Sequence, residues 1–147
     1  MRKSFTRLSL MALAAVAAVA AVAAAQSKAP PPFTDEETLR HFQAIVRMNS
    51  ADPGGSEQPV IDYLKGVLEK DGIAVEVFTL ESGRPNLVAR LKGSGKRKPL
   101  LMMGHADTVN IDEKKWTEPP FSAARVNGHI YGRGTIDDKD NVTAGLM

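Results

Sequence analysis

The segment Pro99-Leu-Leu-Met-Met-Gly-His-Ala-Asp107 decides how the rest of this sequence is interpreted. Its first six residues form a short continuous apolar run, which is typical of a strand buried on both faces in an α/β sheet. The run leads directly into His105-Ala106-Asp107, and functional sites are usually built where strands of such sheets end. We therefore expect a buried strand over residues 99–104 with chemically active side chains at its end.

The His105-x-Asp107 pattern has two explanations. In extended backbone, residues two apart point to the same side, so the imidazole and the carboxylate can lie together. A carboxylate beside an imidazole fixes its tautomer and raises its basicity, as a metal-ligating histidine requires. A hydrogen-bonded His/Asp pair that ends a strand, with no metal, accounts for the same residues. The tripeptide alone favours this second explanation and leaves the first one open.

A second polar cluster, Gly132-Arg-Gly-Thr-Ile-Asp-Asp-Lys-Asp140, follows a predicted strand and leads towards a predicted helix. Its glycines permit an unusual backbone path in a loop that carries carboxylates. The spacing is neither that of an EF-hand nor that of a phosphate-binding loop, and by itself it is also compatible with a charged turn. The chain has no cysteine. Together with His105, the cluster offers an imidazole and hard carboxylates, which suit Zn²⁺ or a similar divalent ion.

Two amphipathic helices are predicted before these clusters. Thr34-Asp-Glu-Glu37 fits a capping box, and apolar residues recur at helical spacing after it, so we expect a helix over about residues 35–48. The run Asp52-Pro-Gly-Gly55 breaks the chain, and Ser56 can cap a second helix with one apolar stripe. Asp71-Gly72 ends that helix.

The remaining segments have the patterns of strands and turns. Residues 73–80 and 86–92 alternate in part, and residues 81–85 join them as a hairpin-like loop. Asn127-Gly128 suits a tight two-residue hairpin turn. A further helix is expected to start near Asn141. Helices and strands in this order predict an α/β fold with a mixed sheet flanked by helices.

The first 25 residues differ in composition from the rest. They carry three basic side chains and no acidic one, and they end in an apolar run rich in alanine. This is the pattern of a secretory signal peptide, with a retained membrane anchor as the alternative and the export route left open. Residues 26–33 form a proline-rich spacer, and residues 34–147 form the folded part. We expect a periplasmic or secreted protein with no membrane contact after signal cleavage.

The charge balance argues against a nucleic-acid partner. The signal segment holds three of the 19 basic residues, which leaves 16 basic against 17 acidic side chains. The isoelectric point near 9.0 therefore comes mainly from that segment. Without a basic surface, nucleic-acid binding loses its electrostatic support. The absence of cysteine also excludes disulfides and a thiol nucleophile.

Three blocks in the second half of the chain resemble a known enzyme family. They are Leu101–Val109, Trp116–Phe121 and Ile130–Lys139. The family is that of the zinc-dependent exopeptidases and amidohydrolases, which includes glutamate carboxypeptidase, acetylornithine deacetylase, succinyl-diaminopimelate desuccinylase, carnosinase-type dipeptidases and aminoacylases. The resemblance implies the amino-terminal part of a zinc-peptidase-like catalytic domain.

The resemblance also implies roles for individual residues. His105 resembles the terminal ligand of one metal ion, and Asp137 resembles the carboxylate that bridges two Zn²⁺ ions. Asp107 resembles the acidic partner that orients His105, and we count it with the catalytic site. Asp138 stands where family members have a strained peptide bond that aims the bridging carboxylate. Asp140 stands where many relatives have glycine, a departure that concerns loop geometry more than metal binding.

The implied activity is hydrolysis of C–N amide bonds in small peptides or N-acyl amino acids by an exported enzyme. The family's general base, its other metal ligands, an oxyanion-stabilising histidine and a smaller domain that mediates pairing as a homodimer have no counterpart in these residues. We therefore expect residues 34–147 to be an incomplete catalytic domain, with no measurable activity and at best weak zinc affinity alone. The alternative is a non-catalytic secreted binding module that keeps the fold.

Four other residues have side chains that could take part in function. His41 and His129 are interpreted as ordinary surface or boundary histidines, and the resemblance assigns them no role. Trp116 is expected in a packed loop over the sheet edge rather than in a substrate cleft. Arg133 is interpreted as structural, with a nearby carboxylate as its expected partner.

Overall fold

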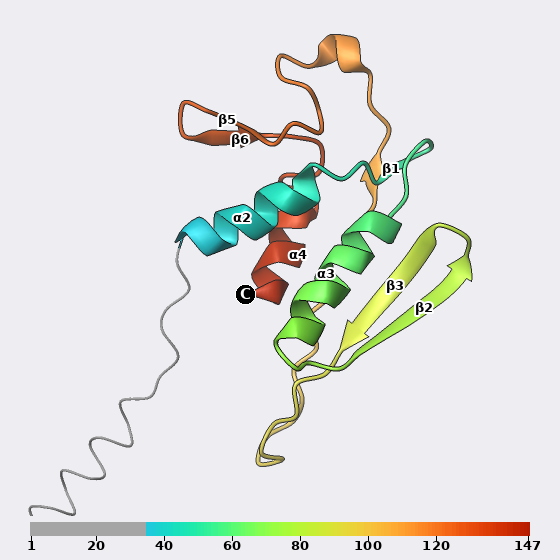
Figure 1. Ribbon diagram of the computed structural model, residues 1–147, viewed down its shortest axis with the longest axis vertical. Coiled ribbons are helices and arrows are strands. Elements are labelled where there is room, and N and C mark those ends of the chain that lie inside the picture. Colours follow the sequence, from blue (N-terminus) through green and yellow to red (C-terminus); the bar gives the residue numbers. More distant parts are fainter. Residues whose placement is uncertain (1–34) are drawn as a thin grey trace, which may run out of the picture. The chain divides into compact units, whose positions relative to one another are not determined.

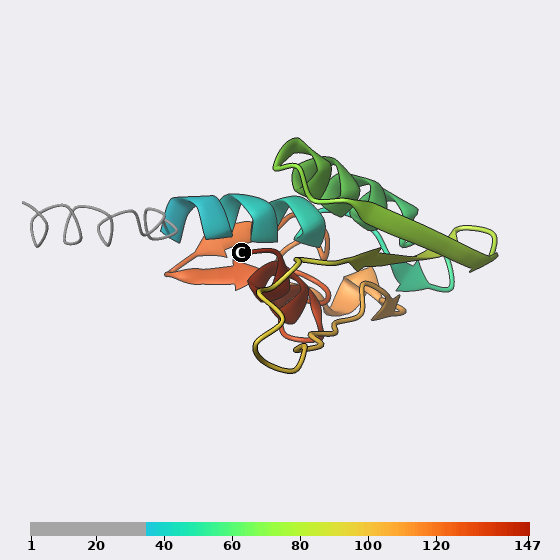
Figure 2. The same ribbon diagram turned by 90° about the horizontal axis from the view of Figure 1, so that it is seen from below.

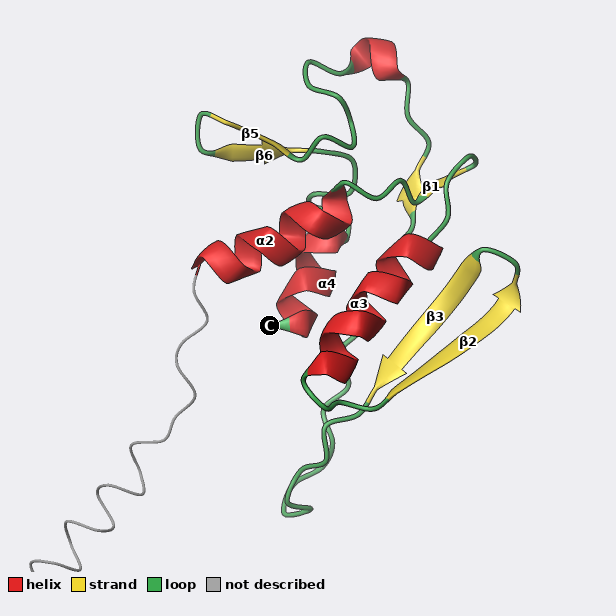
Figure 3. Ribbon diagram, viewed as in Figure 1, coloured by secondary structure: helices red, strands yellow, loops and turns green. Residues whose placement is uncertain are grey.

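The computed structural model describes residues 35–147, which form helices and small strand pairs (Figures 1 and 3). The signal peptide, the proline-rich spacer and the Thr34 cap predicted above lie outside the described residues. Parallel and antiparallel strand pairs both occur, in three two-stranded sheets, so the α/β class is confirmed. Among the described residues, no helix has the length and apolar character needed to span a membrane.

Helices α2 (Asp35–Val46) and α3 (Gln58–Lys70) correspond to the two predicted helices. The Ser56 hydroxyl accepts a hydrogen bond from the Gln58 N–H at 3.1 Å, which satisfies one of the free donors at the start of α3. At the other end, Gly72 has a φ of +76°, and the Ile73 N–H bonds back to the Leu68 carbonyl at 2.9 Å. The glycine can adopt this left-handed conformation without a steric penalty, so the predicted stop is confirmed.

The hydrophobic core lies mainly between α2 and α3. Its buried members are Ile45, Val60, Ile61 and Leu64. Residues outside these helices also pack against the cluster. Among them, Ala106 belongs to residues 104–107, named the His105 segment, and Val142 belongs to α4 (Lys139–Leu146). The core therefore joins the helices to both segments that carry the predicted site.

Both predicted hairpins are present. Strands β2 (Val75–Glu81) and β3 (Arg84–Ala89) pair antiparallel, with a shorter connection than expected. Strands β5 (Ala124–Val126) and β6 (His129–Tyr131) also pair antiparallel. Asn127 and Gly128 join them with φ values of 51° and 81°, which is the backbone of a type I′ turn.

The parallel pair of β1 (Ala51–Asp52) and β4 (Thr108–Val109) is too short to predict from sequence. It is extended by the Ser50 hydroxyl, which donates to the Ala106 carbonyl at 2.6 Å. The Thr108 N–H in turn donates to the Ser50 carbonyl at 2.9 Å. These bonds fix the segment that follows α2 beside the His105 segment.

The prediction of a buried strand over residues 99–104 is wrong. The segment pairs with no strand in the described part of the chain, and Leu100, Leu101, Met102 and Met103 are between 64% and 85% exposed. A strand needs a neighbour for its backbone hydrogen bonds and cover for its faces. The hairpin of β2 and β3 pairs only with itself, so neither requirement is met here.

Helix α2 connects the two ends of the described chain. It packs against α4, and the side-chain amide of Gln43 donates to the Ala123 carbonyl at 2.9 Å, just before β5 (Figure 2). A short 3-10 turn, η1 (Glu113–Lys115), lies in the loop between β4 and β5. Residues 132–138 between β6 and α4, named the carboxylate loop, lie against the end of α2, since a Cβ atom at Gly132 would overlap a methyl carbon of Val46.

Candidate metal centre

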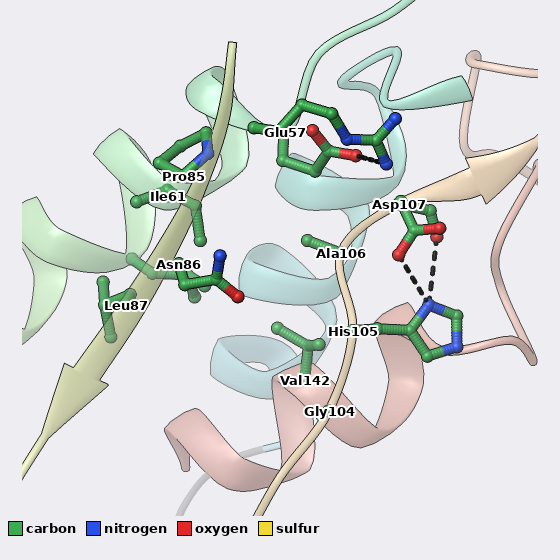
Figure 4. Close-up of a pocket in the computed structure, with 12 residues that line it drawn as sticks. Glu57, Ile61, Pro85, Asn86, Leu87, Gly104, His105, Ala106, Asp107 and Val142 are labelled. Atoms are coloured by element: carbon green, nitrogen blue, oxygen red, sulfur yellow. Dashed lines mark hydrogen bonds and ion pairs between the residues drawn. The ribbon is translucent and has the colours of Figure 1, made fainter. Parts of the chain in front are cut away.

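His105 and Asp107 lie side by side, as their spacing predicts. Figure 4 shows both side chains on one side of the segment and Ala106 on the other, which is the alternation of extended backbone. The His105 Nδ1 atom lies 3.2 Å from an Asp107 carboxylate oxygen and 3.2 Å from the Asp107 carbonyl oxygen. Both are acceptors, so Nδ1 carries the proton and the ring orientation is fixed.

Asp137 approaches the other nitrogen of the same ring. It lies in the loop between β6 and α4, where the Asp137–Asp138 peptide bond is cis, and its side chain is 85% exposed. One carboxylate oxygen lies 2.9 Å from His105 Nε2. The structure therefore brings together all three residues assigned to the site, although Asp137 follows Asp107 by 30 positions in the sequence.

The neighbouring carboxylates favour the protonated form of the His105 ring. Burial lowers the pKa of His105, but the hydrogen bonds to Asp137 and Asp107 and the nearby negative charges raise it by more, so the pKa lies above its usual value. A protonated imidazole donates from both ring nitrogens. A metal ion on Nε2 would take the place of that proton, since a metal-ligating imidazole is neutral.

Asp138 has a contact that the sequence does not predict. Its carboxylate accepts a hydrogen bond from the His105 N–H at 3.1 Å and another from the Asn141 side-chain amide. These bonds hold the pKa of Asp138 below its usual value. The side chain thus ties the carboxylate loop to the His105 segment.

The donor geometry is compatible with a divalent metal. Two ligand atoms bound to one tetrahedral zinc ion at about 2.0–2.2 Å lie roughly 3.3–3.5 Å apart. The 2.9 Å separation of His105 Nε2 and the Asp137 oxygen is therefore short by about half an ångström, a difference that the 85% exposed Asp137 side chain has room to make up. Asp107 stays on Nδ1 and does not converge on the same point. In residues 35–147 there is no group of three or more His, Cys, Asp or Glu side chains placed to hold a metal ion.

A cavity of about 290 Å³ borders these residues. Its lining includes His105, Asp107, Asp137, Trp116 and Arg133. The Arg133 guanidinium carbon lies 5.2 Å from the centre of the Trp116 ring, which is a cation–π contact. Among the described residues, Arg133 therefore has an aromatic partner in place of the expected carboxylate. Trp116, which was expected in a packed loop rather than in a cleft, lines the cavity.

A second cavity of about 250 Å³ also borders His105 and Asp107 and extends to α3 and β3 (Figure 4). Glu57, Arg84 and Asn86 add to its polar lining. The Arg84 guanidinium pairs with Glu57 at 2.9 Å and with Asp52 at 2.7 Å, which joins the start of α3 to β3. The sequence pattern contains no signal for this network, because its members are spread over loops and strand ends.

The two remaining histidines differ from each other. His129 is exposed on β6, as expected. His41 is only 4% exposed, and its Nδ1 atom lies 2.8 Å from the Tyr63 hydroxyl. The interpretation of His41 as a surface or boundary residue is wrong, because Tyr63 of α3 covers it and supplies the hydrogen bond that burial requires.

The helices and strand pairs make this an α/β protein, and the His105 imidazole between the Asp107 and Asp137 carboxylates is its candidate metal centre. Residues 101–147, which include that centre, match the model of Peptidase family M20/M25/M40. The chain belongs to this family.

The similar proteins include a desuccinylase, a deacetylase and a carboxypeptidase. A probable succinyl-diaminopimelate desuccinylase of Staphylococcus aureus is 32% identical over 114 residues, which cover 76% of this chain and 27% of the relative. An acetylornithine deacetylase of Vibrio atlanticus is 39% identical over 106 residues, 70% of this chain and 27% of the relative. An uncharacterized carboxypeptidase of Schizosaccharomyces pombe is 48% identical over 62 residues, 40% of this chain and 10% of the relative. The chain thus spans about a quarter of the length of the first two.

Proposed function

We propose that this protein is an exported, metal-dependent hydrolase that cleaves C–N amide bonds in small peptides or N-acyl amino acids. The observation that carries the proposal is the position of His105 between Asp107 and Asp137 in a chain of the M20/M25/M40 family. The names of its relatives, a desuccinylase, a deacetylase and a carboxypeptidase, all describe cleavage of such bonds.

In this proposal the His105 imidazole, through Nε2, and the Asp137 carboxylate would hold Zn²⁺, with Asp137 as the bridging carboxylate that the family resemblance implies. The metal would supply polarisation of the scissile carbonyl and a water molecule with a pKa lowered towards neutrality. Asp107 keeps the His105 proton on Nδ1, so that the lone pair of Nε2 faces the metal. The Asp138 carboxylate holds the backbone at His105 in place.

The Asp137 carboxylate would also supply negative charge that offsets the repulsion between bound cations. The described residues provide two of the proposed ligands and no third. We therefore propose that residues 34–147 by themselves have weak zinc affinity and no measurable turnover.

The test is hydrolysis of N-succinyl and N-acetyl amino acids and dipeptides by the full-length protein, with zinc and with a chelator. His105→Ala and Asp137→Ala should each abolish turnover and reduce zinc content with little change in fold. His129→Ala, an exposed histidine away from the site, is the matched control and should keep both. Normal zinc content and activity in His105→Ala or Asp137→Ala would refute the assignment. Zinc binding without turnover of any substrate would favour the non-catalytic binding module.

Export is part of the proposal and rests on the first 25 residues alone. The mature protein should begin after the small residues at Ala23–Ala25, because signal peptidases cleave after such positions. Amino-terminal sequencing of protein from the periplasm or medium would establish this. Recovery of the protein only in membranes, with Met1 retained, would favour the anchor.

A further inference from the structure

Lys139 is an unusual residue to find beneath the carboxylate loop. It is the first residue of α4 and lies two positions after Asp137. Its exposed fraction is 0%, and it is the largest fully buried side chain in the part of the chain that the structure describes. Lysine is almost never fully buried unless its ammonium is paired, so the surroundings of this group need an explanation.

The ammonium of Lys139 is aimed at the end of helix α2. Its Nζ atom donates to the Met48 carbonyl at 2.8 Å, two residues after the helix ends. Met48 lies just beyond the helix, near the negative end of the helix dipole, so a cation is favourable there. The Phe121 ring lies 5.8 Å from Nζ and adds an aromatic face to its surroundings.

No carboxylate within residues 35–147 forms an ion pair with this lysine. The hydrogen bond from Nζ to the Met48 carbonyl is therefore a polar contact that offsets the burial of this group.

The loop itself is packed on the stem of this lysine. The Lys139 N–H donates to the Gly134 carbonyl at 3.0 Å, which closes the loop on itself. A Cβ atom at Gly134 would lie 3.2 Å from Lys139 Cδ and 2.6 Å from a methyl carbon of Thr108. The backbone of the loop thus approaches both the lysine stem and β4 more closely than any side chain would allow.

We propose that Lys139 is a positioning residue whose buried ammonium fastens the carboxylate loop to the end of α2 and thereby sets the place of Asp137 opposite His105. The consequence for zinc rests on the proposed role of Asp137 as a ligand. The anchor itself is independent of that role, because it consists of contacts among Lys139, Met48 and Gly134.

The test compares a charge-deleting variant with a restored one. Lys139→Met keeps an apolar stem of similar length and removes the ammonium. Because the chain has no other thiol, Lys139→Cys can be alkylated selectively with bromoethylamine in urea and refolded, which returns an ammonium on a stem of lysine length. Lys65→Met is the matched control, because Lys65 is a partly exposed lysine of α3 that pairs with Glu69.

Amide hydrogen exchange measures the anchor without any metal. In Lys139→Met, the amides of Arg133 and residue 139, which donate to the carbonyls of Pro120 and Gly134, should exchange about tenfold faster or more, whereas amides within α3 should not change. Alkylated Lys139→Cys should recover the parent protection, and Lys65→Met should never lose it. Unchanged loop amides, or equal acceleration throughout the chain, would overturn the proposal.

Zinc titration followed through the ring signals of His105 measures the consequence for the site. Zinc affinity should fall about tenfold or more in Lys139→Met, as for loss of outer-shell support, and should return in the alkylated variant. If zinc does not change the ring signals of His105 in the unsubstituted full-length protein, the proposed metal role of His105 and Asp137 fails. The hydrogen-exchange result still decides whether Lys139 anchors the loop. The positioning role would be refuted if the loop amides of Lys139→Met exchanged faster while its zinc affinity stayed equal to that of the unsubstituted protein.

Discussion

Gly134 offers the sharpest test of how the carboxylate loop is held. Its φ of +83° lies in the left-handed region, which costs an alanine about 1–2 kcal/mol. The added Cβ would also lie 2.6 Å from a methyl carbon of Thr108, so the loop or β4 must shift. Overpacking of this kind costs about 1–3 kcal/mol. We therefore expect Gly134→Ala to reduce the free energy of unfolding by about 2–5 kcal/mol.

Two other glycines separate the contributions. Gly72 has a φ of +76° with nothing within 4 Å of an added Cβ, so Gly72→Ala should cost only the backbone term, about 1–2 kcal/mol. Gly66 lies inside α3, also with nothing within 4 Å, and Gly66→Ala should stabilise the chain by up to about 1 kcal/mol. The assay is urea unfolding followed by circular dichroism. A cost for Gly134→Ala no greater than that for Gly72→Ala would show that the loop is not packed against Thr108.

Three further predictions concern the core, a turn and a buried histidine. Ile45→Ala should lower the free energy of unfolding by about 2–5 kcal/mol in the same urea assay, because Ile45 is fully buried in the core; a loss smaller than about 1 kcal/mol would be inconsistent with that core. Asn127→Ala should cost about 1 kcal/mol at a φ of 51°, whereas Asn127→Gly should be tolerated; equal effects would contradict the type I′ turn. Burial and then the charge of Arg40 lower the pKa of His41 below 6.5, so the unfolded chain binds the proton more readily. The contribution of His41 to the free energy of unfolding should be complete above pH 6.5 and should decline as the pH falls from 6.5 through the lower folded-state pKa. His41→Gln should remove this decline. Parallel stability–pH profiles of the two proteins would disprove the prediction.

Local patterns predicted the helices and hairpins well, because each depends on neighbouring residues. The apolar periodicity placed α2 and α3 to within two residues, and Asn127-Gly128 placed the turn between β5 and β6. The side-by-side position of His105 and Asp107 followed from extended backbone alone. These features require no knowledge of distant contacts.

The wrong prediction, and the features that the sequence does not predict, all depend on long-range packing. The apolar run at residues 99–104 has the composition of a buried strand, but burial requires neighbours, and none in the described residues pairs with it. The parallel pair of β1 and β4 joins two-residue segments that have no pattern of their own. The sequence also does not predict the burial of Lys139, because a lysine next to aspartates is normally solvated. Its burial depends on the contact with Met48 after α2, which is distant in sequence.

The proposed function depends most directly on whether His105 and Asp137 bind the same metal ion. A crystal structure of the full-length protein prepared with zinc, with anomalous scattering measured at the zinc absorption edge, would answer this. We predict a peak within about 2.0–2.2 Å of both His105 Nε2 and an Asp137 carboxylate oxygen, with Asp107 still on Nδ1. A zinc peak elsewhere, with the direct hydrogen bond between His105 and Asp137 intact, would contradict the proposal.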